Sequence, residues 1–131
     1  MPLPDIASFP SAFRVLVVED EFLIAMERDA ILKEGGFEVL GPVSTVQAAL
    51  RQIRAERPDA AVLDVSLRGE KITPVAAVLL AMNVPFVLAS AYIPADLADD
   101  PTLASVRNLG KPTSPAVLLN AMHEYRRSAT R

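Results

Sequence analysis

The chain has 131 residues, a formal net charge of −3 and no cysteine. This length favours one domain of ordinary size, and the lack of cysteine excludes disulfides, thiol catalysis and cysteine-ligated metals. The acidic balance argues against broad contact with nucleic acid, and the single histidine, His123, excludes a zinc site built on several histidines.

The chain carries no evident targeting or membrane segment. Residues 1–13 contain three prolines and lack a cationic region followed by an apolar core, so they do not resemble a signal peptide. Residues 74–94 approach the length of a membrane span, but Asn83, Pro85 and Ser90 favour a buried helix followed by a strand. We therefore expect a cytoplasmic protein that makes no contact with a membrane.

The first half of the chain alternates strand and helix patterns. Residues 14–18, which are apolar and mostly β-branched after Arg14, predict a strand covered on both faces, and the helical repeat from Phe22 to Ile31 is stopped by Gly35-Gly36. A second strand is expected over about 37–43. The next helix begins at Ser44 or Thr45 and ends before Pro58.

The second half continues the same alternation. Strands are predicted over about 59–64, 85–89 and 105–109, with 65–73 as a loop and a helix from Pro74 to about Met82. Residues 94–104 contain two prolines, so any helix there should be short or broken. Thr113 or Ser114 caps a last helix, with Pro115 in its first turn. The pattern predicts an α/β sandwich of (βα)5 type.

Four of the apolar runs end in polar residues that suit one site. The runs lead into Glu19-Asp20-Glu21, Asp64, Ser90 and Lys111. Ligands of open α/β sheets bind along the carboxyl edge of the parallel strands, where these side chains would converge. An acidic cluster, a hydroxyl and a lysine suit a divalent cation and a phosphoryl group.

These motifs together resemble the receiver domain of two-component response regulators. They are Val17-Val18-Glu19-Asp20-Glu21, Leu63-Asp64-Val65-Ser66-Leu67, Ala89-Ser90-Ala91 and Lys111-Pro112. The resemblance implies a flavodoxin-like three-layer fold with a parallel five-stranded sheet of order 2-1-3-4-5. It also implies a receiver domain over 13–127, an N-terminal extension over 1–12 and a C-terminal tail over 128–131.

The resemblance implies a role for each matching residue. Asp64 matches the phosphoacceptor, a carboxylate that attacks the phosphorus of phosphohistidine. Glu19 and Asp20 match the acidic pair that holds Mg²⁺ with Asp64, and Ser66 matches the position that offers a backbone carbonyl to the metal. Ser90 and Lys111 match the hydroxyl and the lysine that contact the phosphoryl group, and the Lys111-Pro112 bond is commonly cis in the family.

The chain departs from most receivers at the aromatic switch. Asn108 occupies the position three residues before the site lysine, where most receivers carry an aromatic residue. Residues 86–92 instead resemble the Phe-x-x-Ala-Thr-Gly-Tyr pattern, nicknamed FAT GUY, of an atypical group, with Ser90 for Thr and Ala91 for Gly. We expect Tyr92 to act with Ser90 in switching, or else to pack at the loop edge without a kinetic role.

The resemblance implies a single-domain, stand-alone or stress-signalling receiver. Its phosphodonor would be a sensor histidine kinase, often of the HWE type, or a histidine phosphotransfer protein. Such a protein acts as a monomer or weak homodimer and catalyses only its own phosphorylation and dephosphorylation. Two alternatives remain: a degenerate receiver that works as a phosphorylation-independent binding module, and a Mg²⁺-dependent phosphohydrolase. Ser66 disfavours the phosphohydrolase because such enzymes place an acidic residue there.

Overall fold

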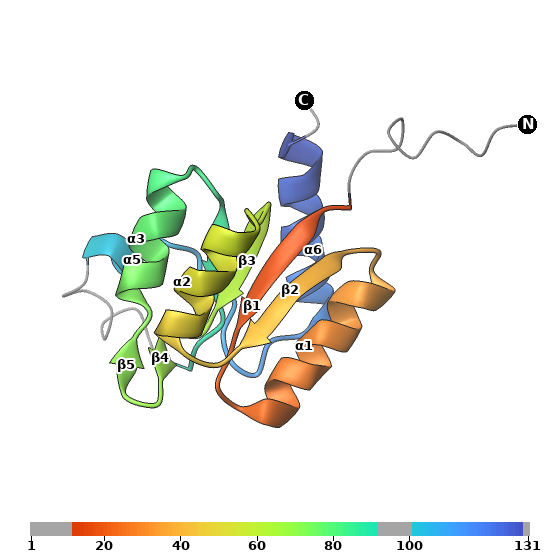
Figure 1. Ribbon diagram of the computed structural model, residues 1–131. Coiled ribbons are helices and arrows are strands. Elements are labelled where there is room, and N and C mark those ends of the chain that lie inside the picture. The colour runs from red at the N-terminus through yellow and green to blue at the C-terminus, as the bar shows by residue number, and fades with distance from the viewer. Residues whose placement is uncertain (1–11, 92–100, 130–131) are drawn as a thin grey trace, which may run out of the picture.

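The computed structural model describes residues 12–91 and 101–129. Its centre is a parallel sheet of four strands in the order β2-β1-β3-β6 (Figure 1). These strands are Arg14–Val18 (β1), Glu38–Val43 (β2), Ala60–Leu63 (β3) and Phe86–Leu88 (β6). The predicted α/β class is confirmed, and the observed strand order agrees with the flavodoxin-like arrangement.

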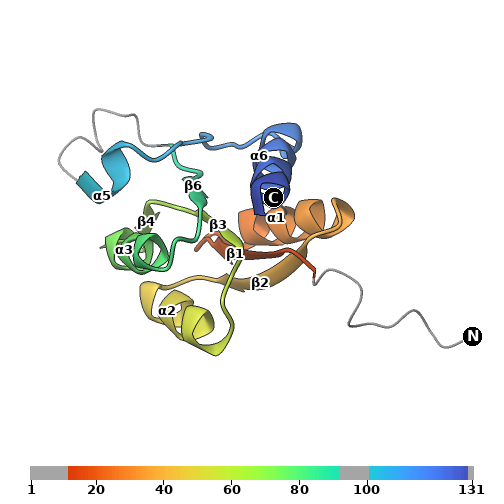
Figure 2. The same cartoon turned by 90° about the horizontal axis from the view of Figure 1, so that it is seen from above.

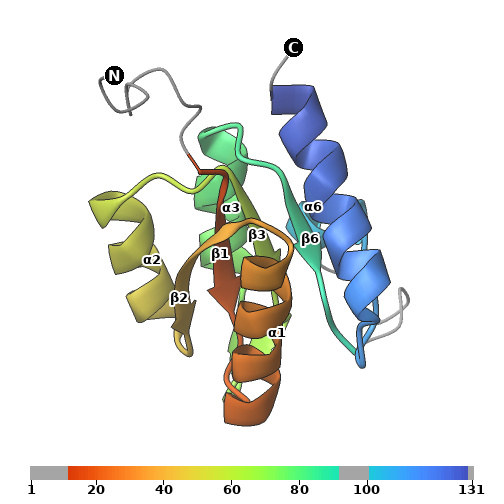
Figure 3. The same ribbon diagram turned by 90° about the vertical axis from the view of Figure 1, so that its right-hand side faces the viewer.

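Helices cover both faces of the sheet. Helices α1 (Phe22–Glu34) and α6 (Pro115–Ala129) lie on one face, and α2 (Val46–Ala55) and α3 (Thr73–Ala81) lie on the other (Figure 2). The short helix α5 (Pro101–Ala104) contacts α3. In the view of Figure 3, α1 and α6 stand in front of the sheet and α3 stands behind it.

Strand β1 shows why the sheet is buried on both sides. Successive side chains of a strand point to opposite faces, and here both faces are apolar. Leu16 and Val18 join the core under α2 and α3, whereas Val15 and Val17 join the core under α1 and α6. All four are fully buried. The apolar run over 15–18 is therefore explained by a central strand between two helical layers.

The predicted helix caps are present at two helices. The hydroxyl oxygen of Thr45 accepts a hydrogen bond from the Ala48 backbone N–H at 3.0 Å, which caps α2. At α6, the Ser114 hydroxyl oxygen accepts from the Val117 N–H at 3.3 Å, while the Thr113 hydroxyl donates to the Gly110 carbonyl. Ser114 is therefore the capping residue of this pair.

The fifth strand, predicted over 105–109, is reduced to a single bridge between Leu88 and Asn108. The Leu88 N–H donates to the Arg107 carbonyl at 2.9 Å, and the Leu109 N–H donates to the Leu88 carbonyl at 2.7 Å. Both ends of the segment leave the extended conformation: the Val106 N–H bonds back to Leu103, and Gly110 has φ of 87°. Only the middle of the segment therefore pairs with β6, which is the neighbour that the predicted strand order gives to the fifth strand.

The segment 65–73 is not the plain loop that the sequence predicted. Ser66–Leu67 (β4) and Glu70–Lys71 (β5) form a small antiparallel hairpin. Its two turn residues, Arg68 and Gly69, have φ of 51° and 87°, the left-handed conformation that tight two-residue hairpin turns require. An arginine is uncommon in this conformation, so the sequence Arg68-Gly69 did not indicate a hairpin turn.

The predicted irregular segment 94–104 is described only in its last part, where α5 forms one short turn. Tyr92 lies outside the described residues. Residues 74–91 contain most of α3 and all of β6, a helix followed by a strand as the sequence predicted; β6 is buried, whereas α3 buries only one face and leaves Leu80 51% exposed. Within residues 12–91 and 101–129, no helix has the length and apolarity needed to cross a membrane.

Candidate functional site

The side chains predicted to converge lie together at the carboxyl edge of the sheet. Glu19, Asp20 and Glu21 follow β1, Asp64 follows β3, and Ser90 lies two residues after β6. A cavity of about 380 Å³ is lined by residues from each of these segments, namely Asp20, Glu21, Asp64, Arg68, Ser90 and Lys111. The fold thus brings together a buried carboxylate, a hydroxyl and a cation from distant parts of the chain.

Lys111 forms ion pairs with three carboxylates of the site. Its ammonium group lies 3.0 Å from a carboxylate oxygen of Asp64, 3.0 Å from one of Glu21 and 3.2 Å from one of Glu19. Burial lowers the pKa of Lys111, but the hydrogen bonds to Asp64 and Glu21 outweigh it and raise the pKa above its ordinary value. Lys111 therefore stays protonated, and it holds the three carboxylates around one positive charge.

Glu21 does not cap helix α1 with its side chain. It occupies the position before α1, but its side chain makes no capping hydrogen bond. Its carboxylate reaches Lys111 instead and is largely exposed. The acidic run therefore serves the site rather than the start of α1.

Glu19 is buried, and both of its carboxylate oxygens accept hydrogen bonds. One carboxylate oxygen accepts a hydrogen bond from the guanidinium of Arg28 at 2.8 Å, and the other accepts from Lys111 and from the Glu21 backbone N–H at 3.0 Å. Burial raises the pKa of Glu19, and the nearby Asp64 carboxylate adds to this effect, while Arg28 and Lys111 oppose it. Arg28 was not singled out from the sequence, and it is only 3% exposed.

Glu19, Asp20 and Asp64 form an acidic cluster that could hold a metal ion. Each offers a carboxylate oxygen, and these atoms all lie within 4.8 Å of one another. Hard divalent cations prefer oxygen ligands, and a cation relieves the repulsion among carboxylates at such distances. The donor set therefore fits Mg²⁺ or a similar ion.

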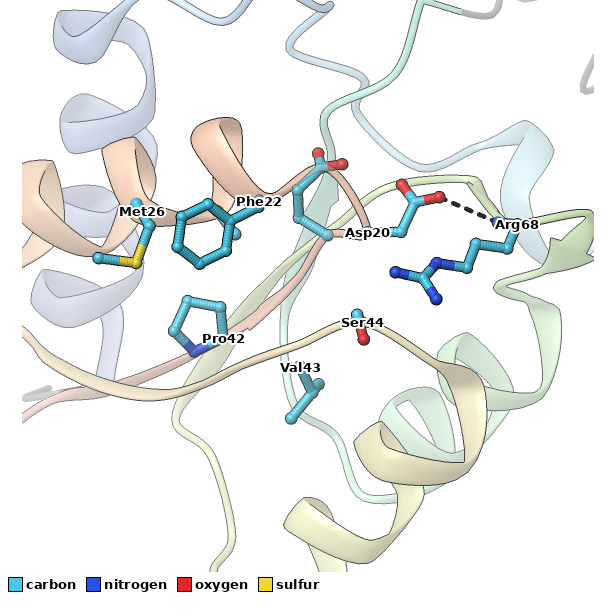
Figure 4. A pocket seen from close by; sticks show the side chains of 9 residues that line it. Asp20, Phe22, Met26, Pro42, Val43, Ser44 and Arg68 are labelled. Carbon is cyan, nitrogen blue, oxygen red and sulfur yellow. Dashed lines mark hydrogen bonds between the residues drawn. The ribbon is translucent and has the colours of Figure 1, made fainter.

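The β4–β5 hairpin borders the site through Arg68. Its backbone N–H donates to a carboxylate oxygen of Asp20 at 3.0 Å, as the dashed line in Figure 4 shows. A second cavity of about 250 Å³ lies on the other side of Asp20, where Phe22, Met26, Pro42 and Val43 form apolar walls. Figure 4 shows Phe22 and Met26 of α1 facing Pro42 across this cavity.

Ser90 is 2% exposed, and Asn108 fixes its backbone. The side-chain oxygen of Asn108 accepts from the backbone N–H of Ser90 at 3.1 Å and from that of Gly110 at 2.9 Å. The residue that replaces the usual aromatic thus connects the loops that carry Ser90 and Lys111. The sequence signalled its departure from the common pattern but not these hydrogen bonds.

The other candidate residues are placed as follows. Ser66 begins β4, two residues after Asp64, and the Lys111-Pro112 peptide bond is cis. His123 lies on α6 and is half-buried against Phe37, with ring centroids 4.9 Å apart. A guanidinium nitrogen of Arg126 lies 2.8 Å from its Nδ1. His123 therefore belongs to the packing between α6 and the sheet.

Comparison with known proteins gives close matches in sequence and structure, although no family model matches the chain. The transcriptional regulatory protein PdtaR of Mycobacterium tuberculosis is 31% identical over 87 residues, which are 66% of this chain. The chain spans 42% of the length of these curated relatives. It therefore corresponds to part of such a protein.

Solved structures match over nearly the whole chain. SdrG from Sphingomonas melonis Fr1 is 36% identical, with a TM-score of 0.74, and the match covers 89% of this chain and 98% of SdrG. A structure of SdrG in a BeF3-activated conformation matches with a TM-score of 0.71, covering 87% of this chain and 97% of that one. The response regulator receiver domain from Methylobacillus flagellatus, 23% identical, shares the fold with a TM-score of 0.75, covering 88% and 99%.

The sheet order and the site at its carboxyl edge define a response regulator receiver domain. The identity to SdrG over nearly its full length agrees with this. The chain belongs to the receiver-domain family of response regulators, as the sequence motifs had indicated.

Proposed function

We propose that this receiver accepts a phosphoryl group on Asp64 and transmits the signal by protein–protein contact. The observation that carries the proposal is the environment of Asp64. This residue is 5% exposed, and its carboxylate lies at the edge of a cavity, 3.0 Å from the Lys111 ammonium and within the acidic cluster. The activated form of its relative SdrG supports the same reading.

Each nearby side chain has a part in the proposed transfer. A carboxylate oxygen of Asp64 forms a bond to phosphorus while the P–N bond of the donor phosphohistidine breaks, and the electron pair returns to the imidazole nitrogen. The Lys111 ammonium stabilises a phosphoryl oxygen as a point charge, and the Ser90 hydroxyl donates a hydrogen bond to another. The protein would catalyse only this transfer and the later hydrolysis of its own acyl phosphate.

The acidic cluster and the Ser66 carbonyl would hold Mg²⁺. When bound, this ion supplies charge that neutralises the phosphoryl oxygens, where positioning and electrostatics provide most of the rate. Asp20 and Asp64 line the larger of the two cavities at the site, whereas Glu19 lines the second cavity together with Asp20. Tyr92 stays a predicted partner of Ser90 in switching.

The partner is proposed to be a phosphohistidine protein, either a sensor kinase of the HWE type or a phosphotransfer protein. An exposed apolar surface lies on α1 beside the site, where Phe22 is 72%, Leu23 80% and Met26 48% exposed. Exposed clusters of large apolar side chains on a small domain mark contact surfaces. Their position next to Asp20 suits a partner that must bring its phosphohistidine to Asp64.

A phosphorylation-independent binding module is the second candidate, and Asn108 favours it. Its hydrogen bonds to Ser90 and Gly110 restrain the loops that would have to move on activation. Beryllofluoride with Mg²⁺, which mimics an acyl phosphate, separates the two functions. A phosphoacceptor shows amide shift changes around Asp64, Ser90 and Lys111 in NMR spectra, and Asp64→Ala abolishes them. A module of the second kind shows no such changes in either protein.

A further inference from the structure

Arg28 is a buried cation within an apolar stripe of α1. The buried residues of this helix are Ala25, Arg28 and Leu32, the spacing of one helical face. Arg28 and Glu19 are both almost completely buried, with side-chain exposures of 3% and 0%. A guanidinium has a high cost of burial unless it is paired, and here Glu19 is its partner at 2.8 Å.

This pair changes the charge of the acidic cluster. Glu19, Asp20, Glu21 and Asp64 bring four carboxylates to one edge of the sheet, and Lys111 contacts three of them. Arg28 does not line the cavity, and it supplies a second positive charge at the carboxylate oxygen of Glu19 that Lys111 does not contact. Two net negative charges then remain, which one divalent cation would neutralise. Without Arg28 the same carboxylates would carry a larger uncompensated charge.

We propose that Arg28 is a positioning residue that acts as a permanent counter-cation for Glu19 and weakens the binding of Mg²⁺ at the cluster. This inference rests on the proposed phosphoacceptor function. A guanidinium does not lose its proton in proteins, so its repulsion of an incoming cation is always present. It also keeps Glu19 in place when no metal is bound. Arg28 therefore weakens metal binding, and in return the site keeps its shape when no metal is bound.

The test compares Mg²⁺ binding to the wild-type chain and to Arg28→Gln by isothermal titration calorimetry at low salt. Glutamine is neutral but can still donate a hydrogen bond to Glu19. We expect Arg28→Gln to lower the Kd for Mg²⁺ about tenfold, which corresponds to about 1.4 kcal/mol of binding free energy. The repulsion between the Arg28 guanidinium and a divalent cation at the cluster is expected to reach this size in a partly buried site. Saturating Mg²⁺ should also raise the Tm of Arg28→Gln more than that of the wild type.

Two further variants isolate the buried charge. Arg28→Lys keeps the positive charge, and its Kd should stay within about threefold of the wild type because the Coulomb repulsion is retained. Lys33→Gln removes a positive charge from the exposed side of the same helix, where it pairs with Asp29 at 3.1 Å. Its Kd should not change, because surface charges at a distance are screened.

An Arg28→Gln protein that folds and binds Mg²⁺ with unchanged or weaker affinity would overturn the inference. If that variant is unfolded without metal, the inference requires Mg²⁺ to restore its circular dichroism spectrum, and failure to do so also overturns it. A wild-type chain that binds no Mg²⁺ contradicts the proposed function together with this inference. A wild-type chain that binds Mg²⁺, beside an unaffected Arg28→Gln, contradicts the inference alone.

Discussion

The side-chain oxygen of Asn108 accepts hydrogen bonds from the backbone N–H groups of Ser90 and Gly110, at 3.1 and 2.9 Å. Ser90 is the hydroxyl residue of the site, and Gly110 directly precedes Lys111. One amide side chain therefore connects the two loops that carry the hydroxyl and the cation. It does so from the position where most receivers carry an aromatic residue, so the two loops are held by hydrogen bonds instead of by aromatic packing.

Replacing this amide should loosen both loops. Asn108→Ala removes two side-chain hydrogen bonds from a half-buried position and should lower the free energy of unfolding by about 1–2 kcal/mol. Urea denaturation measures this change, and hydrogen exchange of the Ser90 amide should become faster. Asn120→Ala, on the exposed side of α6, is the control and should change stability by less than about 0.5 kcal/mol. Equal effects in the two variants would show that Asn108 does not hold the loops.

The fold and most of the site could be predicted because each signal was local. Residues 15–18, which follow Arg14, are apolar at every position, as expected of a strand covered on both faces. Asp64 and Glu19 each directly follow such a run, and the geometry of parallel sheets brings those positions to one edge. The same geometry predicted the position of Lys111 at this edge, although the strand before it is reduced to one bridge.

The features that were missed depend on contacts between distant residues. The hairpin at 66–71 rests on a left-handed arginine at 68 and on a hydrogen bond to Asp20, and no local preference predicts either. Arg28 could have been noticed, because it lies three residues after Ala25 and four before Leu32 on the buried stripe of α1. A charged residue on such a stripe needs a partner, but the sequence alone does not identify Glu19 as that partner.

Gly41 is expected to be the least replaceable glycine beside the site. It has φ of 91°, and an added Cβ would lie 2.7 Å from the backbone nitrogen of Val43 and 3.1 Å from the carbonyl oxygen of Val17. Gly41→Ala should lower the free energy of unfolding by about 2–4 kcal/mol, since backbone strain and a clash with rigid backbone atoms combine. Thermal or urea unfolding measures the loss.

Gly69→Ala is the matched control for Gly41→Ala. Gly69 has φ of 87°, but nothing lies within 4 Å of an added Cβ, so only the backbone strain of about 1–2 kcal/mol applies. A Gly41→Ala protein as stable as Gly69→Ala would contradict the close approach of β1 and β2 at this point.

His123 should make stability depend on pH in mildly acidic solution. Burial, together with the charges of Arg126 and Arg127, holds the pKa of His123 below its ordinary value of 6.5. The native protein then binds fewer protons than the unfolded chain, so the free energy of unfolding falls as the pH drops below 6.5 through the lowered pKa. Urea denaturation of wild type and His123→Gln across this range should show a smaller acid loss in the variant. Parallel curves would contradict the assignment to His123.

The exposed surface of α1 should matter for protein phosphodonors and not for small ones. Leu23→Ser should leave stability within about 0.5 kcal/mol of the wild type, because the side chain is 80% exposed. Labelling by acetyl phosphate should be unchanged, whereas transfer from a phosphorylated HWE-type kinase should slow about tenfold if Leu23 anchors that partner. A normal rate of transfer from the kinase would place the docking surface elsewhere.

The most direct test of the phosphoacceptor account is intact-mass spectrometry after incubation with acetyl phosphate, with and without Mg²⁺. The account predicts that the wild-type chain gains the mass of one phosphoryl group only when Mg²⁺ is present, and that Asp64→Asn gains none. A wild-type chain that never gains mass, or an Asp64→Asn chain that gains as much as the wild type, would contradict it.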